Sequence, residues 1–544
     1  MRLTKRSVWV LPLVVLSCAL AGSSAGPRVE AAASPSAAAD DGAGSVAGFV
    51  KVYTLLEQNF ADPIDVDKAI YKGAIPGMLL TLDPHSNFFD PRDYRLFLEE
   101  QKGHYYGVGM RVAARNGRTV VLYPLPGAPA HKAGVRPGDV ITKIGDKSTV
   151  NMSTTDVADL LKGPRGTPVT FEVSREGVDA PIPFTLTRDE VHQASVEEGF
   201  WLEPGIAYVK ILSFGENTSR ELEDTLRRLG EANIKGLVLD LRDNPGGLLN
   251  EAVAVADHFL RKNQVVVSQG GRSSPERPYV ARTGNRGRDY AIVALVNRSS
   301  ASAAEILSGA LQDHDRAWIL GETTFGKGLV QTVFPLAENT ALALTTAHFY
   351  TPSGRLIQRD YTNLSFYDYY NHKGPNSRNL NDVKTTDSGR TVYGGGGITP
   401  DEKYETPKLD PLETALYVDG LFNFTRSYFA SHSAALPKGW MPDADVIEDL
   451  HDYELKRGTK FSEAEFTADY DWIRRSLAKE IYTTAFDWDA ANQLSAEIDP
   501  EVRRAVDAMP KAATLLESAR KTVAERAAPP PSLIPAVAAA AGAK

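Results

Sequence analysis

The spacing of hydrophobic residues predicts that helices give way to strands near residue 103. Residues 45–102 carry apolar side chains at intervals of three and four, which is the period of a helix with one buried face. From Gly107 to Arg188, short alternating runs are separated by Gly and Pro turns, a pattern typical of strands. In this part we expect a strand at 119–123, a helix at 154–161 and a strand at 168–175.

A different pattern begins at Ile206, where very apolar runs alternate with helical periods until about Tyr350. The expected strands are 206–211, 236–241 and 291–296, and the expected helices are 219–229, 248–260 and 303–313. Buried strands that alternate with helices form βαβ units around a largely parallel sheet. The fold class is therefore α/β in this part and α+β for the whole chain, with functional loops at the carboxyl ends of the strands.

Helical periods return after Glu405 and continue almost to the C-terminus. Ser462 with Glu465 has the spacing of a capping box, and Asp499 before Pro500 is typical of a helix start. The changes of pattern divide the chain into a signal peptide at 1–21, a flexible linker at 22–44, a helical segment at 45–102, a strand-rich domain at 103–188, an α/β core at 189–404, a helical extension at 405–526 and an Ala/Pro-rich disordered tail at 527–544.

The N-terminus predicts export. Basic Arg2, Lys5 and Arg6 precede a short apolar run, which is the pattern of a secretory signal. Two outcomes fit it: cleavage after Ala21, or attachment of a lipid to Cys18, the only cysteine. In both cases the mature chain has no disulfide and no catalytic thiol. We expect an exported protein, periplasmic or otherwise extracytoplasmic, that contacts a membrane only through a lipid anchor at Cys18.

Composition limits the partners. Apolar residues make up 42% and charged residues 24% of the 544 residues, which is ordinary for a globular protein with a sizeable core. The formal net charge is −9 and no basic run or basic aromatic stripe is present, so nucleic acid is not an expected partner. No HExxH motif, paired cysteines or clustered histidines indicate a metal, and we expect no cofactor.

The strongest candidate chemistry lies where the strand at 291–296 ends and the helix at 303–313 begins. The loop between them contains Ser299, Ser300 and Ser302. A serine at such a junction exposes its hydroxyl at the positive end of a helix, where free N–H groups stabilise developing negative charge. Taken alone, a serine at a helix start is more often only an N-cap.

Lys327 is the candidate general base for such a serine. It lies between Gly326 and Gly328, so backbone can pack closely around the amine and remove it from water. To accept the serine proton, its pKa has to fall from about 10.4 towards roughly 7–8. Gln331, four residues on, could orient the amine without adding charge. By itself, a lysine beside glycines is more often solvated.

Several motifs occur together over residues 45–402. They are Ser302-Ala303-x-Glu305-Ile306, Leu311-Gln312-Asp313, Gly321-Glu322, Phe325-Gly326-Lys327-Gly328 with Gln331, Leu239–Gly247, Tyr350–Arg355 with Ile357-Gln358, Gly397–Asp401 and Asp83–Ser86. With the inserted strand-rich domain, they resemble the C-terminal processing (tail-specific) serine peptidase family. The resemblance implies a ClpP/crotonase-like βαβ protease core with an inserted PDZ domain, an N-terminal helical segment and a C-terminal helical extension.

The same resemblance implies a Ser–Lys dyad. It makes Ser302 the nucleophile, Lys327 the base and Gln331 the residue that assists the lysine. The register to Glu305 and the spacing of 25 residues to Lys327 select Ser302 among the three serines.

The family also forms an oxyanion hole from backbone amides. Carried over, these are the N–H of Ala303 and an N–H of Gly246 or Gly247. Removing one such donor typically costs about 10²–10³ in rate, so the glycine loop matters for the predicted reaction.

The order of strands and turns at 103–188 resembles a PDZ domain. In that domain a loop, here Gly107-Val108-Gly109-Met110, cradles a terminal carboxylate with backbone N–H groups while the peptide adds as a strand. The resemblance also places Arg136 near bound peptide, with a solvated turn arginine as the alternative. We therefore expect protein or peptide substrates with exposed C-termini, cleaved near those termini through an acyl-enzyme.

Two other functions remain open at this stage. The chain could be a silent binding protein that uses the PDZ-like domain and keeps the hydrolase fold as a scaffold. It could also be a hydrolase with a Ser-His-Asp triad based on His314 or His348, whereas His85 fits better in a turn that caps the next helix. An adaptor protein or a second copy of the chain is a further partner left open. The extension at 405–526 could serve as an oligomerisation surface, a substrate gate or a docking site.

Overall fold

The computed structural model describes residues 39–115, 117–362, 364–371, 379–432, 435–437 and 439–527. It divides into two compact units, Met1–Ile75 and Pro76–Lys544, which are described separately. The predicted signal peptide with Cys18, the predicted linker up to residue 38 and the predicted tail from residue 528 lie outside the described residues. No helix within the described ranges is long and apolar enough to span a membrane.

The first unit is helical. Its elements are α2 (Ala39–Asn59), α3 (Val66–Ala69) and the π-helix η2 (Ile70–Ala74). The helix α2 extends into the segment predicted as a flexible linker, which was expected to end at residue 44. Gly42 and Gly44 weaken helix propensity there, but extending an existing helix by one residue avoids the cost of nucleation.

In the second unit, a six-stranded antiparallel sheet forms the PDZ-like domain. Its strands pair in the order β3-β4-β5-β7-β8, with β6 on β5. Their bounds are β3 (Met110–Arg115), β4 (Arg118–Pro124), β5 (Val140–Ile144), β6 (Lys147–Ser148), β7 (Pro168–Ser174) and β8 (Ile182–Thr187), and the helices are α6 (Pro129–Lys132) and α7 (Thr154–Leu161). The chain enters through β2 (His104–Gly107) and leaves through β9 (Asp189–His192), which pair with each other as a two-stranded stalk.

The α/β core is built on a second six-stranded sheet, in the order β10-β11-β12-β15-β16-β21. Its strands are β10 (Phe200–Glu203), β11 (Ile206–Lys210), β12 (Gly236–Asp240), β15 (Ala291–Val296), β16 (Trp318–Gly321) and β21 (Glu402–Lys403). From β11 to β21 all neighbours are parallel, which confirms the predicted βαβ arrangement. The helices α8 (Thr218–Arg228), α9 (Leu249–Asp257) and α10 (Ala303–Asp313) contribute to the core on one face of the sheet.

An antiparallel sheet lies beside the core, in the order β1-β18-β13-β14 with β17 also on β18. Its strands are β1 (Asn87–Phe89), β13 (Val265–Gly271), β14 (Ser274–Val280), β17 (Leu329–Pro335) and β18 (Ala341–Tyr350), near α4 (Ile75–Leu80), α5 (Pro91–Lys102) and α11 (Phe366–Tyr370); β19 (Asn379–Thr385) and β20 (Thr391–Gly394) form a separate hairpin. The strand β1 interrupts the segment predicted as helical. It forms because β18 supplies its hydrogen-bond partners, which a local pattern of three residues cannot reveal.

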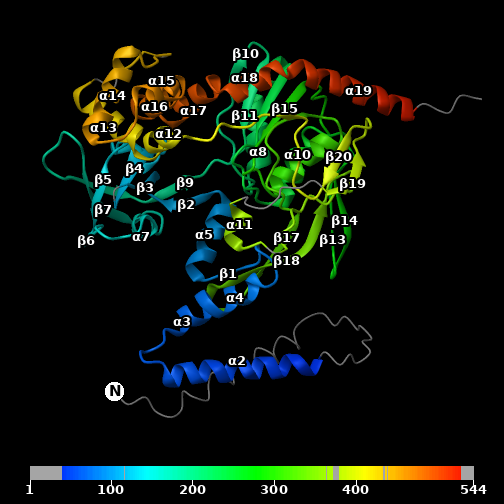
Figure 1. The fold of residues 1–544 in the computed structure, drawn as a ribbon, viewed down its shortest axis with the longest axis horizontal. Coiled ribbons are helices and arrows are strands. Elements are labelled where there is room, and N and C mark those ends of the chain that lie inside the picture. The colour runs from blue at the N-terminus through cyan, green and yellow to red at the C-terminus, as the bar shows by residue number, and fades with distance from the viewer. Residues whose placement is uncertain are drawn as a thin grey trace, which may run out of the picture. The chain divides into compact units, whose positions relative to one another are not determined.

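The C-terminal extension has two parts. A bundle with its own apolar core contains α12 (Pro411–Ala415), the π-helix η5 (Leu416–Gly420), α13 (Leu421–Ser431), α14 (Ala444–Arg457), α15 (Glu463–Ala468) and α16 (Tyr470–Ala485). After α17 (Trp488–Glu497), the helices α18 (Pro500–Asp507) and α19 (Met509–Ala527) pack on the second face of the parallel sheet (Figure 1). The predicted caps at Ser462 and Asp499 are confirmed.

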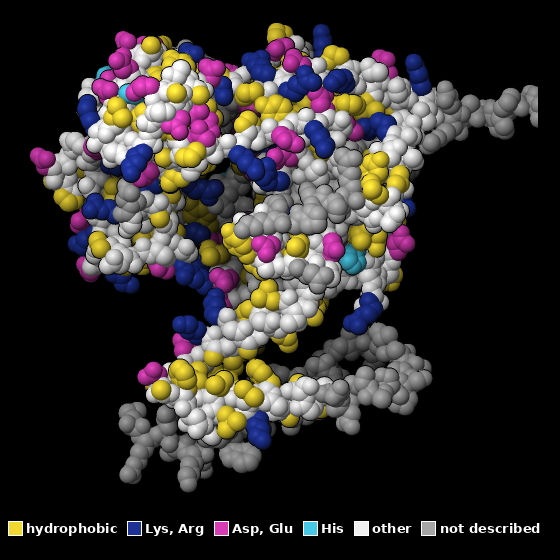
Figure 2. Space-filling view, viewed as in Figure 1, with side chains coloured by type: hydrophobic (Ala, Val, Ile, Leu, Met, Phe, Trp, Pro, Cys, Tyr) yellow, Lys and Arg dark blue, Asp and Glu magenta, His cyan; other side chains and the backbone are white. Residues whose placement is uncertain are grey.

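Both charge signs are mixed over the surface. On the face shown in Figure 2, Lys and Arg side chains are interspersed with Asp and Glu. Some of these charges join α5 to α7 of the PDZ-like domain: Arg92 contacts Asp159 at 2.8 Å and Lys162 contacts Glu99 at 2.6 Å. The helix α5 is capped by Asp90, so the turn at 82–86 does not cap it as predicted.

Candidate active site

The three neighbouring serines have different environments. Ser299 is exposed. Ser300 is fully buried, and its hydroxyl donates to the Leu241 carbonyl at 2.8 Å, so it fastens the loop to the end of β12. Ser302 is half-buried directly before α10, at the carboxyl end of β15. Of the three, Ser302 has the position that a nucleophile at a helix N-terminus requires.

Ser302 also has an uncommon backbone conformation, with φ 53° and ψ −112°. A positive φ is rare outside glycine, asparagine and aspartate, and such strain persists only where the surroundings enforce it. Here the Ser302 N–H donates to Glu305 Oε2 at 2.8 Å, and the Ala301 N–H before it donates to the Asn244 carbonyl at 2.9 Å. The sharp turn is therefore fixed on both sides.

Glu305 joins the serine loop to the lysine loop. Its side chain is fully buried, and its Oε2 accepts the Ser302 N–H at 2.8 Å and the Lys327 N–H at 2.9 Å. Its Oε1 accepts the Gly326 N–H at 2.7 Å and the Thr324 hydroxyl at 2.5 Å. Burial raises the pKa of Glu305 to about 7, although these donors favour its ionised form. One carboxyl group thus holds both candidate catalytic residues by their backbone.

Lys327 occupies a closely packed loop. A Cβ at Gly326 would lie 2.9 Å from the Arg359 Cβ, and one at Gly328 would lie 2.9 Å from the Gln358 nitrogen, so only glycine fits on either side. Burial lowers the pKa of Lys327, while the negative charges of Glu305 and Asp83 oppose this shift. A lysine with a lowered pKa is suited to accept a proton.

Gln331 lies on β17, opposite Thr345 of β18. Its Nε2 is buried and makes no hydrogen bond within the described part of the chain. Among these residues, no hydrogen bond joins the side chains of Ser302, Lys327 and Gln331 either. Catalytic contacts are often long in unliganded enzymes and tighten when substrate binds, so the open arrangement is compatible with a dyad.

The glycine loop after β12 lies against the nucleophile. A Cβ at Gly246 would lie 2.7 Å from the Ser302 Cβ, so the two backbones are in contact. The Gly246 N–H donates to the Asn244 Oδ1 at 2.8 Å and is already engaged. The N–H groups of Gly247 and Ala303 donate to no group among the described residues. This pattern favours Gly247 over Gly246 as the second oxyanion donor.

Aromatic side chains surround His85 beside the lysine loop. The ring nitrogens of His85 contact the hydroxyls of Tyr369 at 2.9 Å and Tyr370 at 3.1 Å, and the Phe325 ring lies at a centroid distance of 6.3 Å from the His85 ring. Burial and the nearby charge of Lys327 lower the pKa of His85 to about 3, so its ring is neutral. The turn assigned to His85 is present, since Asp83 accepts its N–H at 2.7 Å, but its place beside Lys327 was not foreseen.

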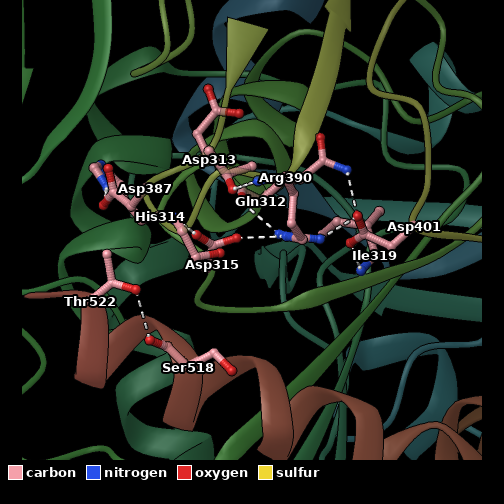
Figure 3. Close-up of polar contacts among 12 residues, drawn as sticks. Gln312, Asp313, His314, Asp315, Ile319, Asp387, Arg390, Asp401, Ser518 and Thr522 are labelled. Atoms are coloured by element: carbon pink, nitrogen blue, oxygen red, sulfur yellow. Dashed lines mark hydrogen bonds and ion pairs between the residues drawn. The ribbon is translucent and has the colours of Figure 1, made fainter.

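His314 cannot serve as the base for Ser302. It follows the last residue of α10, and one ring nitrogen contacts Asp387 at 2.8 Å (Figure 3). The other ring nitrogen contacts the Val265 carbonyl at 2.7 Å. A helix of 11 residues is about 16 Å long, and Ser302 lies at its other end. The polar cluster at this end, in which Arg390 bridges Asp315 and Asp401, holds the fold together.

His348 makes no contact that would form a triad. It lies on β18 opposite Leu329. Its Nδ1 is buried and makes no hydrogen bond among the residues that the structure describes.

The PDZ-like loop at 107–110 is closely packed and leaves backbone N–H groups without partners among the described residues. Gly109 has a φ of 72°, and a Cβ there would lie 2.3 Å from the Ala128 Cβ, so this position requires glycine. Val108 and Met110 are buried, and β2 ends at Gly107. The N–H groups of Val108 and Gly109 donate to no described group. Beside them, β3 is the edge strand of its sheet and can accept a further strand.

Arg136, which the resemblance places near bound peptide, lies in a turn of the PDZ-like domain. Its side chain is exposed and lines a cavity of about 500 Å³ together with Arg426, Phe429 and His432 of the C-terminal extension. The loop that carries it thus faces the extension.

Comparison with known proteins supplies the family. The model of "Peptidase family S41" matches residues 205–363, and that of "PDZ domain" matches residues 120–175. The "Carboxy-terminal-processing protease" of Bartonella bacilliformis is 41% identical over 296 residues, which are 54% of this chain and 68% of that protein. The chain belongs to peptidase family S41, with the carboxy-terminal processing proteases. It is therefore a serine-type peptidase with a PDZ domain.

Other members of this family are more distant. The "Carboxy-terminal processing protease CtpA" of Bacillus subtilis is 33% identical over 310 residues, 57% of this chain and 66% of that protein. The solved "photosystem II D1 C-terminal processing protease" is 28% identical, with 66% of this chain and 86% of that chain covered at a TM-score of 0.34. The extension at 405–526 lies beyond the residues matched by the S41 model.

Sequence reasoning missed part of this site. In the sequence, Glu305 served only to select Ser302 among the three serines, whereas in the structure it links the serine loop to the lysine loop. Its signal was present, because a glutamate in a helix whose other residues up to Leu311 are apolar or small must find buried partners. His85 and Asn244 gave no such signal, since their neighbours come from distant segments.

Proposed function

We propose that the chain is an endopeptidase that cleaves proteins near their exposed C-termini through a dyad of Ser302 and Lys327. The observation that carries this proposal is the double attachment of both loops to Glu305 Oε2, at 2.8 and 2.9 Å. It brings a strained, half-buried serine and a desolvated lysine to one place at the carboxyl end of the sheet. A ClpP/crotonase-like core would account for this placement.

The proposed reaction has two halves. Neutral Lys327 accepts the proton of Ser302 as Oγ attacks the scissile carbonyl, and the N–H groups of Ala303 and Gly247 stabilise the oxyanion. The Lys327 ammonium then gives its proton to the leaving amine, which releases the C-terminal fragment. Water, deprotonated by Lys327, hydrolyses the ester on Ser302 and regenerates both residues. In this proposal Gln331 orients the amine of Lys327 through its side-chain oxygen; its Nε2 is buried and makes no hydrogen bond in the described part of the chain.

Replacing either dyad residue tests the mechanism. Ser302→Ala and Lys327→Ala should each lower kcat by at least about 10⁴ on a protein with an unstructured C-terminal tail. Ser299→Ala and Lys262→Ala, both at exposed positions, serve as matched controls and should retain the parent rate. A fluorophosphonate probe should label the parent at Ser302. Cleavage by Lys327→Ala at the parent rate would refute the dyad and favour a triad on another base.

The PDZ domain is proposed to capture the substrate terminus. The unpaired N–H groups of Val108 and Gly109 match a carboxylate, and the free edge of β3 matches an extended peptide. A substrate tail that ends in an amide should therefore show a KM raised about tenfold, with little change in kcat. Equal KM values for tails that end in a carboxylate and tails that end in an amide would show that the PDZ domain does not bind the terminal carboxylate.

The predicted signal at 1–21 leads us to propose that the enzyme acts outside the cytoplasm, on exported proteins. Fractionation of cells that produce the full chain, with and without Ala21→Arg and Cys18→Ala, separates cleavage from lipidation. Release of Cys18→Ala into the soluble extracytoplasmic fraction would indicate a lipid anchor, and unchanged solubility would indicate cleavage after Ala21.

A further inference from the structure

The outer face of the PDZ sheet is covered by the C-terminal extension. Side chains alternate along β4 and β5, and Val121 and Ile141 point into the domain's own core. Their neighbours Val120 and Val140 are nevertheless 3% and 8% exposed, because Phe422 of α13 packs against them. Without the extension, this apolar strip would face water.

A second contact lies further along β4. Tyr123 stacks on Trp488 of α17 at a centroid distance of 4.3 Å and an interplanar angle of 12°. Lys479 of α16 lies 5.4 Å from the same Trp488 ring. Phe422 of α13 and Trp488 of α17 thus both pack on β4 of the PDZ domain.

A polar contact completes the surface. Arg426 lies against Gly138, where a Cβ would come within 2.9 Å of its side chain, and forms an ion pair with Glu176 at 3.2 Å. Gly138 has a φ of 88°, so the turn both needs glycine and leaves room for the arginine. The extension therefore contacts β4, β5 and two turns of the domain.

The covalent connection of the PDZ domain is weak by comparison. Besides the extension, the domain is joined to the rest of the second unit by the stalk of β2 and β9, whose register contains four residue pairs, and by ion pairs between α5 and α7. A two-stranded ribbon of this length is marginally stable by itself and can bend or twist. Contacts outside the stalk must therefore set the orientation of the domain.

We propose that the C-terminal extension is a clamp that fixes the PDZ domain relative to the α/β core. One end of the extension, α18 and α19, is anchored on the parallel sheet, whereas α13 covers the outer face of the PDZ sheet and Trp488 of α17 stacks on Tyr123 near the end of β4 (Figure 1). Among the described strands β3 pairs only with β4, so its other edge stays open to a peptide. In this proposal the role of the extension is separate from the proposed chemistry at Ser302 and Lys327.

The test loosens the clamp and measures motion of the stalk. Phe422→Ala with Trp488→Ala should increase hydrogen exchange in β2 and β9 by about tenfold or more, while α9 and α10 keep their protection. Tyr417→Ala, an equally large truncation at a side chain that is 68% exposed, is the matched control and should leave the stalk unchanged. Unchanged stalk exchange in a folded double variant would overturn the proposal.

A charge reversal covers the case in which the double variant does not fold. Glu176→Arg places two arginines together at a partly exposed rim, which should loosen the stalk without removing core side chains. Adding Arg426→Glu restores an opposite pair and should restore the protection. Failure of this rescue, or no effect of Glu176→Arg on the stalk, would count against the clamp.

Kinetics give a second readout that rests on the proposed function. A captured tail is delivered at a high effective concentration only if the domain is fixed, so kcat/KM for a long-tailed protein should fall about tenfold in the loosened variants. A rise in kcat/KM would show that the clamp restrains the enzyme instead. If no peptidase activity is found at all, the exchange experiment still decides on the clamp.

Discussion

At the scale of single residues, the site depends on two buried groups with opposite charge preferences. Burial disfavours the ammonium of Lys327 and the carboxylate of Glu305, and the charge of Glu305 in turn favours the ammonium of Lys327. Since Glu305 contacts only the backbone N–H of Lys327, it can hold the loop without forming a direct ion pair with the amine. The amine can then remain available as a base.

The pH dependence of cleavage follows from this arrangement. As the proposed base, Lys327 accepts a proton only when neutral, so kcat/KM should rise with pH and level off below the ordinary lysine pKa, because burial lowers the Lys327 pKa. The Glu305 carboxylate raises that pKa, and Glu305→Gln should therefore move the rising limb to lower pH by roughly one unit. The plateau should also fall, because an amide cannot accept all four hydrogen bonds.

The matched control is Glu276→Gln, at an exposed position on β14, whose profile should superimpose on that of the parent. The profiles of kcat/KM are measured from pH 5 to 10 on one peptide. If the rise of kcat/KM in Glu305→Gln occurs at the same pH as in the parent, Glu305 has a structural role only.

At the scale of elements, three strand-to-loop junctions build the site. The loops after β12, β15 and β16 all leave the carboxyl end of the same sheet, and each is held by its neighbour. The loop after β12 is also attached to α18, because Arg242 contacts Glu501 at 2.8 Å and Asp240 at 2.7 Å. The C-terminal extension thus helps to hold the loop that carries the proposed oxyanion donor.

Close contact between two of these loops gives a sharp prediction. Gly246→Ala should lower kcat/KM by about 10²-fold or more, since the new Cβ would displace Ser302 from the oxyanion donors. Gly287→Ala is the control: its φ of 84° is similarly strained for alanine, but no atom lies within 4 Å. The two variants share the backbone cost and differ only in the clash, so equal activities would refute the contact.

At the scale of the whole molecule, both faces of the parallel sheet are buried. The face away from α8–α10 packs Val238, Val293 and Leu295 against Val502 and Met509 of the C-terminal helices. Gly236 leaves room for Met509, whose sulfur would lie 3.0 Å from a Cβ at that position. The last helices therefore belong to the core of the enzyme as much as the strands do.

Removing this packing should destabilise the protein. Met509→Ala should lower the free energy of unfolding by about 2–5 kcal/mol, as expected for a buried methionine replaced by alanine. Met78→Ala, at a side chain that is 60% exposed, should change it by less than about 0.5 kcal/mol. Urea unfolding of both variants measures the difference, and equal midpoints would show that α19 adds little to the core.

Much of the fold follows from local patterns. The strand at 291–296 and the helices at 154–161 and 303–313 have the bounds that their spacing predicts. The elements that were missed or misplaced are short or depend on partners. The strand β1 forms because it pairs with β18, and α2 begins early because an existing helix extends without a new nucleation cost. Period and capping are local signals, whereas pairing is not.

For Ser302 and Lys327, the sequence by itself determined the candidate pair through their motif, their spacing and the glycines around the lysine. It could not determine how the two are held together, because Glu305 reaches the Lys327 loop, Asn244 reaches the serine loop and His85 reaches Lys327 only in three dimensions. It also left the extension at 405–526 without a role, since an amphipathic helix shows that it has a partner but not which one. Only the tertiary structure decided that these helices cover the sheet and reach the PDZ domain, because burial joins surfaces that lie far apart in the chain.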